Sequence, residues 1–243
     1  MELELKRGGR TARVETLGGE LVSYRDERGL EYIWGGDPAY WPGRNPLLFP
    51  IVGMLKEGKI RFDGREYAME RHGFARRREF TPAARGEDWV RLELRESAET
   101  LALYPYPFRL AVEQRLTDTG FSTAVTVANP GEGPLPFCLG AHTGFRCPLE
   151  AGERFEDYEL VFPERESCPT LLLRDGLLDR PAALPCLEDT DTLPLDYRWF
   201  DALDTLIFEG LRSRSVALRS RKSGSGVRVS FDGFPMLAFW TMP

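Results

Sequence analysis

Apolar and charged side chains alternate along residues 90–95, and this period of two constrains the fold more than any other feature of the chain. Val90, Leu92 and Leu94 are separated by arginine and glutamate side chains. Successive side chains of a β-strand point to opposite faces, so the segment predicts a strand with one buried face. Similar patterns predict further strands at residues 110–116, 121–128, 205–208, 215–219 and 227–231.

Turn residues separate these segments. Asp63-Gly64 lies between two alternating stretches, residues 60–62 and 67–69, and tolerates the positive φ angles of a tight turn, so it predicts a β-hairpin. The chain holds 24 glycines and 18 prolines, and only residues 97–103 suit a short helix, capped by the serine that begins it. We therefore predict an all-β fold, a large antiparallel β-sandwich.

The length of 243 residues fits one large domain. No internal repeat divides the sequence, and the Pro-rich stretch from Pro163 to Pro194 is interpreted as long loops rather than as a linker between domains. We predict a single domain over residues 1–243.

The charge of the chain argues against several classes of partner. Its formal net charge is −6 and its isoelectric point is about 5.2, so it offers no basic field to nucleic acid or to an acidic membrane surface. Its most apolar stretch, residues 46–55, is too short to cross a bilayer, and its N-terminus lacks the apolar core of a signal peptide. We expect a cytoplasmic protein that binds a small neutral or polar molecule.

The sequence contains no recognisable metal or cofactor motif. Cys138, Cys147, Cys168 and Cys186 have neither the paired spacing nor the nearby histidine of a zinc site, and in a reducing compartment they are most simply free thiols. A phosphate-binding glycine loop is also absent from the sequence. We predict no catalytic metal and no nucleotide cofactor.

The two histidines of the chain lie in similar motifs, each bracketed by glycine and phenylalanine. His72 belongs to Arg-His-Gly-Phe-Ala-Arg, and His142 belongs to Gly-Ala-His-Thr-Gly-Phe. Imidazole titrates near neutral pH and is therefore the natural proton donor or acceptor at ordinary pH. A lone histidine is more often a hydrogen-bonded residue in a half-buried strand, but the shared setting favours one joint site.

Arg44 and Asn45 interrupt a run of aromatic and apolar residues at 40–50. A guanidinium donates several fixed hydrogen bonds to hydroxyl groups, and flat rings cover the apolar face of a sugar. The segment is therefore a candidate carbohydrate-binding site, which we expect to lie beside both histidines. Taken alone, Arg44 is more often a surface residue paired with a carboxylate, and the aromatic residues also suit an ordinary core.

The order of these motifs resembles the aldose 1-epimerase (galactose mutarotase-like) family, especially its bacterial LacX-like branch. The resemblance extends along essentially the whole chain and is most specific at the two histidine motifs. The matching segments are residues 31–34, 40–41, 45–53, 72–76, 104–108, 140–142, 155–158, 234–237 and 240–241.

This resemblance implies a β-supersandwich with a sugar cleft that interconverts the α and β anomers of a hexose without a cofactor. A general acid protonates the ring oxygen while a general base takes the proton of the anomeric hydroxyl, and the open aldehyde rotates and closes on its other face. By motif match, His142 would be the acid, while His72 and Arg44 would bind and polarise the sugar.

Two further residues are assigned to substrate binding. Asn45 neighbours Arg44 in the matching motif. Asp204 is our choice, in preference to Asp201, for the aspartate that binds sugar from a late strand in this family, although a turn residue at a strand end explains it equally well. The expected partner is a hexose.

The chain departs from the family pattern in two places. Thr143 replaces the proline that usually follows the second histidine, so the local backbone is less fixed. The general-base glutamate of the family lies on a strand after the Trp-Thr segment, and no position before Pro243 matches it. A naturally short homologue, a truncated gene and a variant with another carboxylate all explain this.

From these departures we expect the 243-residue chain to bind a hexose weakly and to accelerate mutarotation less than a complete family member. If it proves faster, Asp204 and Glu209 are the first carboxylates to test. An unpaired sheet edge would also favour a homodimer. Two alternative functions stay open: a non-catalytic carbohydrate-binding protein, and an epimerase of a phosphorylated hexose that uses Arg76, Arg77 and Arg78, which are otherwise an ordinary charged surface.

Overall fold

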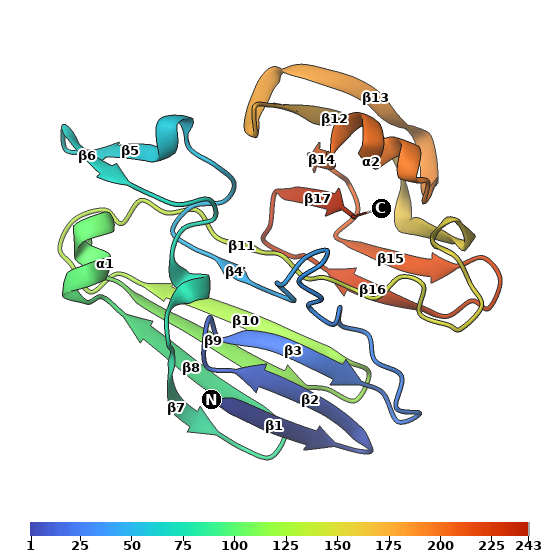
Figure 1. Cartoon of the computed structure of the whole chain (residues 1–243), viewed down its shortest axis with the longest axis horizontal. Helices are drawn as coiled ribbons and strands as arrows, with labels where there is room; N and C mark the ends of the chain where they lie inside the picture. The colour runs from blue at the N-terminus through green and yellow to red at the C-terminus, as the bar shows by residue number, and fades with distance from the viewer. Residues whose placement is uncertain (243) are drawn as a thin grey trace. The chain divides into compact units, whose positions relative to one another are not determined.

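The computed structural model describes residues 1–242. The chain divides into two compact units, Met1–Arg146 and Cys147–Pro243. Both units are built from antiparallel strands joined by turns and short helices (Figure 1). The all-β, antiparallel fold class predicted from the sequence is therefore confirmed, whereas the single domain over residues 1–243 stays a prediction.

The first sheet of the first unit consists of three strands in chain order. These are β1 (Glu2–Arg7), β2 (Arg10–Glu15) and β3 (Glu20–Arg25). In β1 and β2, buried residues alternate with more exposed ones, which is the pattern of a sheet that turns one face to the core. Glu20, at the start of β3, lies opposite Glu15, at the end of β2.

The second sheet has the strand order β10-β9-β8-β7. Its strands are β7 (Thr81–Arg85), β8 (Trp89–Arg95), β9 (Arg109–Leu116) and β10 (Phe121–Ala128). The strands predicted at β8, β9 and β10 are confirmed. A capping box on Ser97 begins helix α1 (Ala98–Leu103), so the predicted short helix is confirmed as well.

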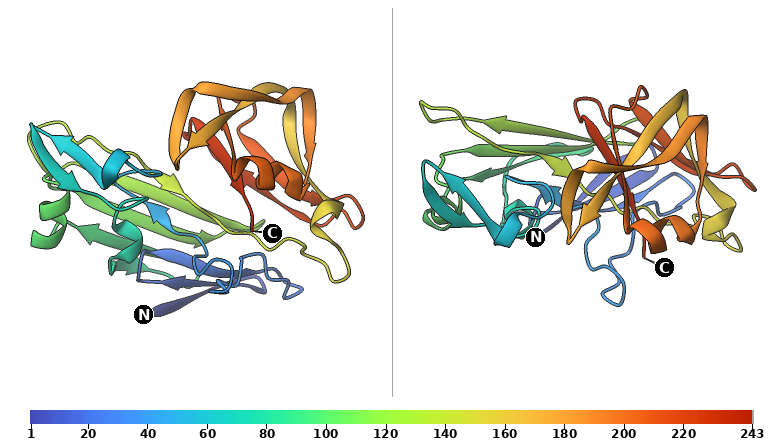
Figure 2. Two further views of the ribbon diagram at one scale, coloured as in Figure 1. Left: turned by 45° about the horizontal axis from the view of Figure 1, so that its top comes forward. Right: turned by 90° about the horizontal axis from the view of Figure 1, so that it is seen from above.

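The two sheets pack face to face and enclose the core of the first unit (Figures 1 and 2). β1 and β2 lie against β9. The core side chains of these strands and of β3 and β8 are Leu3, Leu5, Ala12, Val14, Leu21, Val90, Leu92, Leu94, Leu110, Val112 and Leu116. Fully burying one leucine or valine side chain contributes about 1.5–3 kcal/mol, so this β-sandwich is a stable base for the segments that carry the candidate site.

Short elements complete the first unit: β4 (Leu47–Leu48), η1 (Lys56–Gly58), β5 (Lys59–Phe62), β6 (Arg65–Ala68), η2 (Ala75–Arg77) and β11 (Gly140–Ala141). β5 and β6 form the predicted hairpin, in which Asp63 and Gly64 have φ angles of 47° and 79°. β4 pairs with β11, and η2 also lies against β4. Because β11 precedes His142 and η2 follows His72, both histidine motifs meet the same short strand.

Within residues 147–242, the second unit forms a six-stranded antiparallel sheet with the order β16-β15-β12-β14-β17 and β13 beside β12. Its elements are η3 (Phe155–Asp157), β12 (Tyr158–Arg174), β13 (Leu177–Pro194), α2 (Tyr197–Leu203), β14 (Thr205–Glu209), β15 (Ser215–Ser220), β16 (Gly226–Ser230) and β17 (Met236–Trp240). The strands predicted at β14, β15 and β16 are confirmed. Neither α2 nor β17 was predicted from the sequence.

The interpretation of Pro163 to Pro194 as long loops is wrong, because this stretch forms most of the β12–β13 hairpin. Proline lacks the N–H group that a strand ladder needs and is tolerated at bulges. The ladder of this hairpin is interrupted by several register shifts, and Pro163 and Pro169 each lie inside one of them. These register shifts allow prolines to lie within the strands, although a proline in the sequence usually indicates the end of a strand.

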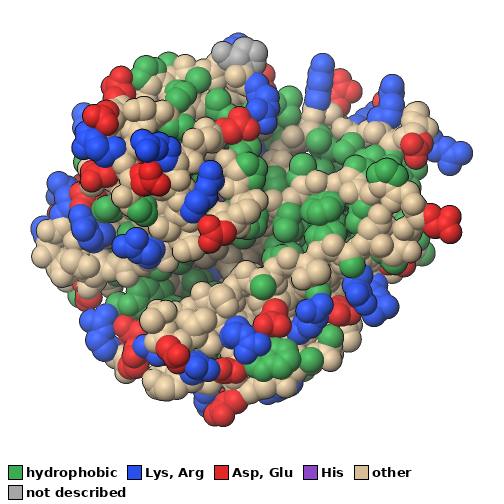
Figure 3. Space-filling model, turned by 180° about the vertical axis from the view of Figure 1, so that it is seen from behind, with side chains coloured by type: hydrophobic (Ala, Val, Ile, Leu, Met, Phe, Trp, Pro, Cys, Tyr) green, Lys and Arg blue, Asp and Glu red, His purple; other side chains and the backbone are tan. Residues whose placement is uncertain are grey.

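Acidic and basic side chains are interspersed over the face shown in Figure 3, and neither sign forms a large continuous area there. That distribution agrees with a mixed, solvated surface on this face. Among residues 1–242, no helix is long and apolar enough to cross a membrane.

Candidate active site

His142 is held in place by the pairing of two short strands in the first unit. β4 and β11 form an antiparallel pair, and immediately beyond it the backbone N–H of His142 donates a hydrogen bond to the carbonyl oxygen of Pro46 over 3.1 Å. The ladder therefore continues past the two-residue strands as far as the imidazole-bearing residue. This pairing fixes the position of His142 against the segment that contains Arg44 and Asn45.

Arg44 and Asn45 contact the two residues that follow His142. The N–H of Gly144 donates to the carbonyl oxygen of Arg44 over 2.6 Å, and the hydroxyl of Thr143 donates to Oδ1 of Asn45 over 2.6 Å. Asn45 is buried, and Arg44 is half-buried. Thr143, which replaces the family's usual proline, thus has a hydroxyl that bonds to the candidate binding segment.

His72 is fixed by hydrogen bonds from both its backbone and its ring. The N–H of His72 donates to the carbonyl oxygen of Gly53 over 2.8 Å, and the N–H of Gly53 donates to Nδ1 of the imidazole over 3.0 Å. His72 has a φ angle of 67°, which is uncommon outside glycine and occurs where surrounding contacts determine the backbone. Because Nδ1 accepts a bond, the neutral ring carries its proton on Nε2.

The two imidazoles lie close together, as the sequence analysis predicted. Their ring centroids are 5.9 Å apart, and the ring planes are inclined at 75°. The indole of Trp41 lies against the imidazole of His142 with a centroid separation of 4.9 Å. The indole N–H of Trp34 donates to the carbonyl oxygen of Trp41 over 2.7 Å, which orients the aromatic segment beside the histidines.

Burial lowers the pKa of both histidines. The pKa of His72 falls from 6.5 to about 4, first because of burial and then because of the charges of His142, Arg76 and Arg71. The pKa of His142 is also lowered, chiefly by burial, while a hydrogen bond to its own backbone acts in the opposite direction. Both imidazoles are therefore predominantly neutral at pH 7.

The pKa of His72 predicts a pH-dependent stability. Between about pH 6.5 and pH 4, His72 is protonated in the unfolded chain but stays neutral in the folded protein. The free energy of unfolding should therefore decrease as the pH falls through this range. After allowance for solvent screening of a half-buried ring, we expect this decrease in the free energy of unfolding to be about 1–2 kcal/mol. Urea unfolding at several pH values measures the decrease.

His72→Asn is the matched variant for this measurement. Asparagine tolerates a positive φ angle and its Oδ1 can accept the bond from Gly53, but it does not titrate. The variant should show a smaller loss of stability between pH 6.5 and pH 4. Equal slopes for the variant and the unmodified protein would contradict the assigned pKa.

Arg76 is a further cation beside the imidazoles. Its charge lowers the pKa of both His72 and His142. The guanidinium is half-buried, Nη2 donates to the carbonyl oxygen of Arg71 over 2.9 Å, and Nε is buried without a hydrogen-bond partner. In the part of the chain that the structure describes, Arg76 forms no ion pair with a carboxylate.

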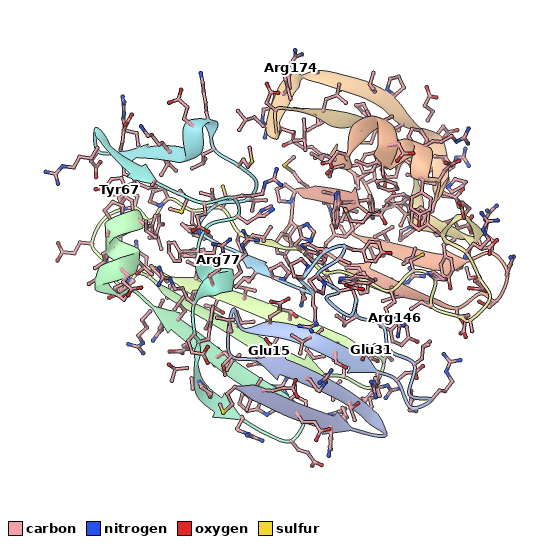
Figure 4. The ribbon with its side chains drawn as sticks, viewed as in Figure 1. Glu15, Glu31, Tyr67, Arg77, Arg146 and Arg174 are labelled. Carbon is pink, nitrogen blue, oxygen red and sulfur yellow. The ribbon has the colours of Figure 1, made fainter. Side chains whose placement is uncertain are left out.

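The other two arginines of this run are paired with carboxylates. Arg77, labelled in Figure 4, forms an ion pair with Glu70 over 2.7 Å, and Arg78 pairs with Glu99. Exposed pairs of this kind contribute little to stability. The interpretation of the run as surface therefore suits Arg77, whereas Arg76 is distinguished by its position near the histidines.

Asp204 belongs to the second unit. It ends helix α2 directly before β14, with a φ angle of 61°, and its Oδ2 accepts a hydrogen bond from the hydroxyl of Thr205 over 2.9 Å. Its position is thus a turn between a helix and a strand. The assignment of Asp204 to substrate binding stays a prediction.

Two residues near the histidines were not assigned to the site from the sequence. Trp41 was noted within an aromatic run, and its contact with His142 could have been expected from that run. Glu20 accepts hydrogen bonds on Oε1 from the backbone N–H groups of Arg44, over 2.9 Å, and Asn45, over 2.5 Å. Nothing in the sequence around Glu20 signals this contact.

The four cysteines are free thiols, as expected. Among residues 1–242, no group of three or more histidine, cysteine, aspartate or glutamate side chains is placed to hold a metal ion. The candidate site described above therefore consists of imidazole, guanidinium, amide and indole groups, which bind hydroxyl-rich or anionic molecules by hydrogen bonding.

An antiparallel β-sandwich that presents two imidazoles beside an Arg-Asn segment is consistent with a galactose mutarotase-like protein. The chain belongs to the aldose 1-epimerase family, which it matches over residues 1–242. Membership in this family indicates an isomerase-type enzyme that acts on sugars.

Several known proteins are similar to this chain. The plasmid-encoded and chromosomal LacX proteins of Lactococcus lactis are each 43% identical over 249 aligned residues, which cover 99% of this chain and 83% of the relative. A galactose mutarotase related enzyme from Lactobacillus acidophilus superimposes with a TM-score of 0.93 at 27% identity, covering 99% of this chain and 80% of that structure. A galactose mutarotase-like protein from Lactobacillus casei superimposes with a TM-score of 0.87 at 28% identity, covering 99% of this chain and 83% of that structure. The galactose mutarotase-like fold is thereby confirmed.

Proposed function

We propose that this protein interconverts the α and β anomers of a hexose by acid–base ring opening. The observation that carries the proposal is the pair of imidazoles 5.9 Å apart beside the Arg44–Asn45 segment. That spacing allows two ring nitrogens to contact neighbouring oxygens of one sugar. The family membership and the LacX-like relatives support the same chemistry.

The hydrogen bonds of His72 give it a binding role. Its Nδ1 is occupied by the N–H of Gly53, so Nε2–H is the ring's free donor toward a sugar oxygen. A pKa of about 4 keeps this donor neutral and unable to act as a strong acid at neutral pH. His72 therefore binds and polarises the sugar.

We assign the general acid to His142. Its imidazolium form is the acid; burial makes this form the minor one at pH 7, while the hydrogen bond to its own backbone acts to raise the pKa of His142. As the C1–O bond breaks, the basicity of the ring oxygen rises and the imidazolium gives its proton to that oxygen, which leaves a neutral imidazole. On ring closure the same nitrogen takes the proton back from the hydroxyl that attacks C1.

Arg44 and Asn45 supply fixed hydrogen-bonding groups to the sugar, and Trp41 supplies a flat apolar surface next to His142. The base that accepts the proton of the anomeric hydroxyl is to be found among carboxylates. Asp204→Asn and Glu209→Gln are the first variants to compare, because a carboxamide keeps the size of the side chain and removes its basicity.

Polarimetry tests this function. Freshly dissolved α-D-galactose and α-D-glucose relax to their equilibrium rotations at a measurable spontaneous rate, and the protein should accelerate at least one of these relaxations in proportion to its concentration. Binding of the sugar without acceleration would instead support the non-catalytic carbohydrate-binding protein. Absence of both binding and acceleration would exclude galactose and glucose as ligands.

A phosphorylated hexose is a second candidate substrate, and Arg76 is the observation that favours it. Its guanidinium lies near both imidazoles, has no carboxylate partner among residues 1–242 and keeps a buried Nε without a hydrogen bond. A phosphate group is a strong acceptor for such a donor. Since C1 must carry a free hydroxyl to open the ring, the phosphate would be on another carbon.

Arg76→Gln separates the two substrates. With a hexose 6-phosphate as the substrate, loss of a charge-assisted bond should raise KM about tenfold or more, while the KM for the free hexose changes little. Arg77→Gln removes a neighbouring cation that is paired with Glu70 and serves as the matched control. Equal effects of the two variants would assign Arg76 to the general surface field.

A further inference from the structure

Glu20 connects the start of β3 to the Arg44–Asn45 segment. Its Oε1 accepts hydrogen bonds from two successive backbone N–H groups, those of Arg44 over 2.9 Å and Asn45 over 2.5 Å. In the described residues Glu20 forms no ion pair with a lysine or arginine, so its charge is satisfied by backbone amides. Bonds from N–H groups to an ionised carboxylate are stronger than those between neutral groups.

The same segment holds His142 in place. Arg44 accepts a bond from Gly144, and Asn45 accepts a bond from Thr143, over 2.6 Å in each case. Both partners follow His142 directly in the chain. A displacement of the Arg44–Asn45 backbone therefore changes the position of the second histidine motif.

The turn before Glu20 also contacts the first histidine motif. The N–H of Gly18 donates to the carbonyl oxygen of Arg78 over 2.8 Å, and a Cβ atom at Gly18 would lie 3.0 Å from the carbonyl oxygen of Arg76. The charge of Glu20 acts to raise the pKa of Arg76. The turn and Glu20 thus connect the first histidine motif to the Arg44–Asn45 segment, which in turn contacts the residues that follow His142.

We propose that Glu20 is the positioning residue of the sugar site: its carboxylate fixes the Arg44–Asn45 backbone and, through it, the place of His142. The structural part of this inference follows from the hydrogen bonds above. Its consequence for sugar turnover rests on the proposed function. Glu20 contacts neither the imidazoles nor a substrate in this role and acts through the backbone.

NMR spectroscopy tests the structural part without any assay of activity. The chain has two histidines, so untagged protein gives two sets of imidazole signals whose pH titrations can be followed separately. Glu20→Ala should shift the amide signals of Arg44 and Asn45 and change the titration midpoint of His142. Glu20→Gln keeps an acceptor oxygen of the same reach and should restore most of these signals.

Glu15→Ala is the matched control, since Glu15, labelled in Figure 4, ends β2 and pairs with Glu20 in the register of β2 and β3. Within residues 1–242 the side chain of Glu15 makes no hydrogen bond or ion pair, so its removal should leave both histidine titrations unchanged. If Glu20→Ala fails to fold, Glu20→Asp takes its place, because a side chain shorter by one methylene cannot reach both amides.

Kinetics give the consequence. If the protein is a mutarotase, Glu20→Ala should lower kcat/KM about ten- to hundredfold, as expected for loss of hydrogen bonds to a charged group, and Glu20→Gln should recover most of it. Shifted NMR signals in an inactive wild-type protein would keep the positioning role and reject the proposed function. Unchanged signals of Arg44, Asn45 and His142 in the Glu20 variants would overturn the inference.

Discussion

Substitution of His142 by alanine is expected to remove about 10²- to 10⁴-fold of the catalysed mutarotation rate, the usual contribution of a general acid. His142 is the residue to which we assign the proton transfer to the ring oxygen, and no other group assigned here can replace it. His72 cannot, because its Nδ1 accepts a hydrogen bond from the N–H of Gly53, which only the neutral ring can do, and its pKa is about 4. The measurement is the polarimetric rate on α-D-galactose and α-D-glucose, corrected for the spontaneous rate in buffer.

His72→Ala is the matched comparison, since it deletes the other imidazole of the same pair. We expect this variant to raise KM with a smaller effect on kcat, because His72 binds the sugar and does not transfer the proton. Sugar binding by His142→Ala should persist and can be followed by intrinsic tryptophan fluorescence, to which Trp41, beside residue 142, contributes together with the other four tryptophans of the chain. A larger loss of kcat in His72→Ala than in His142→Ala would reverse the two assigned roles.

The sequence predicted the histidine pair because two short motifs marked it, and the structure brings the two rings together. It also predicted that Arg44 would lie beside them. The hydrogen bonds of Thr143 and Gly144 join the Arg44–Asn45 segment to the second histidine motif, whereas Nε of Arg44 donates to the carbonyl oxygen of Gly35 over 3.2 Å, so a place for the guanidinium beside the imidazoles stays a prediction. These residues carry recognisable chemistry within a few positions of one another.

Glu20 could not be predicted in the same way. Its role depends on two backbone amides that are 24 and 25 positions away in the chain, and a glutamate at a strand start has an unremarkable local sequence. Arg76 shows the same limit. Its sequence context is a run of three arginines, and only the fold distinguishes it from Arg77, which pairs with Glu70.

The fold was predictable where apolar and charged residues alternate regularly. It was not predictable where the strand contains residues, such as proline, that usually interrupt strands. β8 alternates strictly between apolar and charged residues and was identified from that pattern. The β12–β13 hairpin contains several prolines, and its register shifts are tertiary features that no local rule shows. Helix α2 is seven residues long, too short for a clear helical period.

Gly73→Ala is expected to have the largest effect on stability among single methyl additions near the site. Gly73 has a φ angle of 68°, and an added Cβ would lie 2.5 Å from the carbonyl carbon of Phe49. That carbonyl accepts bonds from Phe74 and Ala75, and Phe49 is fully buried. Because the obstacle is buried backbone, we expect a loss of about 3–5 kcal/mol in the free energy of unfolding.

Gly64→Ala separates the steric overlap from the strain of the positive φ angle. Gly64 has a φ of 79° in the β5–β6 turn, and nothing lies within 4 Å of its Cβ position, so its substitution should cost only the left-handed backbone penalty of about 1–2 kcal/mol. Urea unfolding of both variants gives the difference.

Since Gly73 adjoins His72 and contacts the segment that leads to Gly53, Gly73→Ala should also disturb the imidazole bond to Gly53 and weaken sugar binding. Equal losses of stability in the two variants would show that the Phe49 backbone moves to make room for the added methyl group. In that case the close packing of the His72 motif against Phe49 does not determine the position of His72.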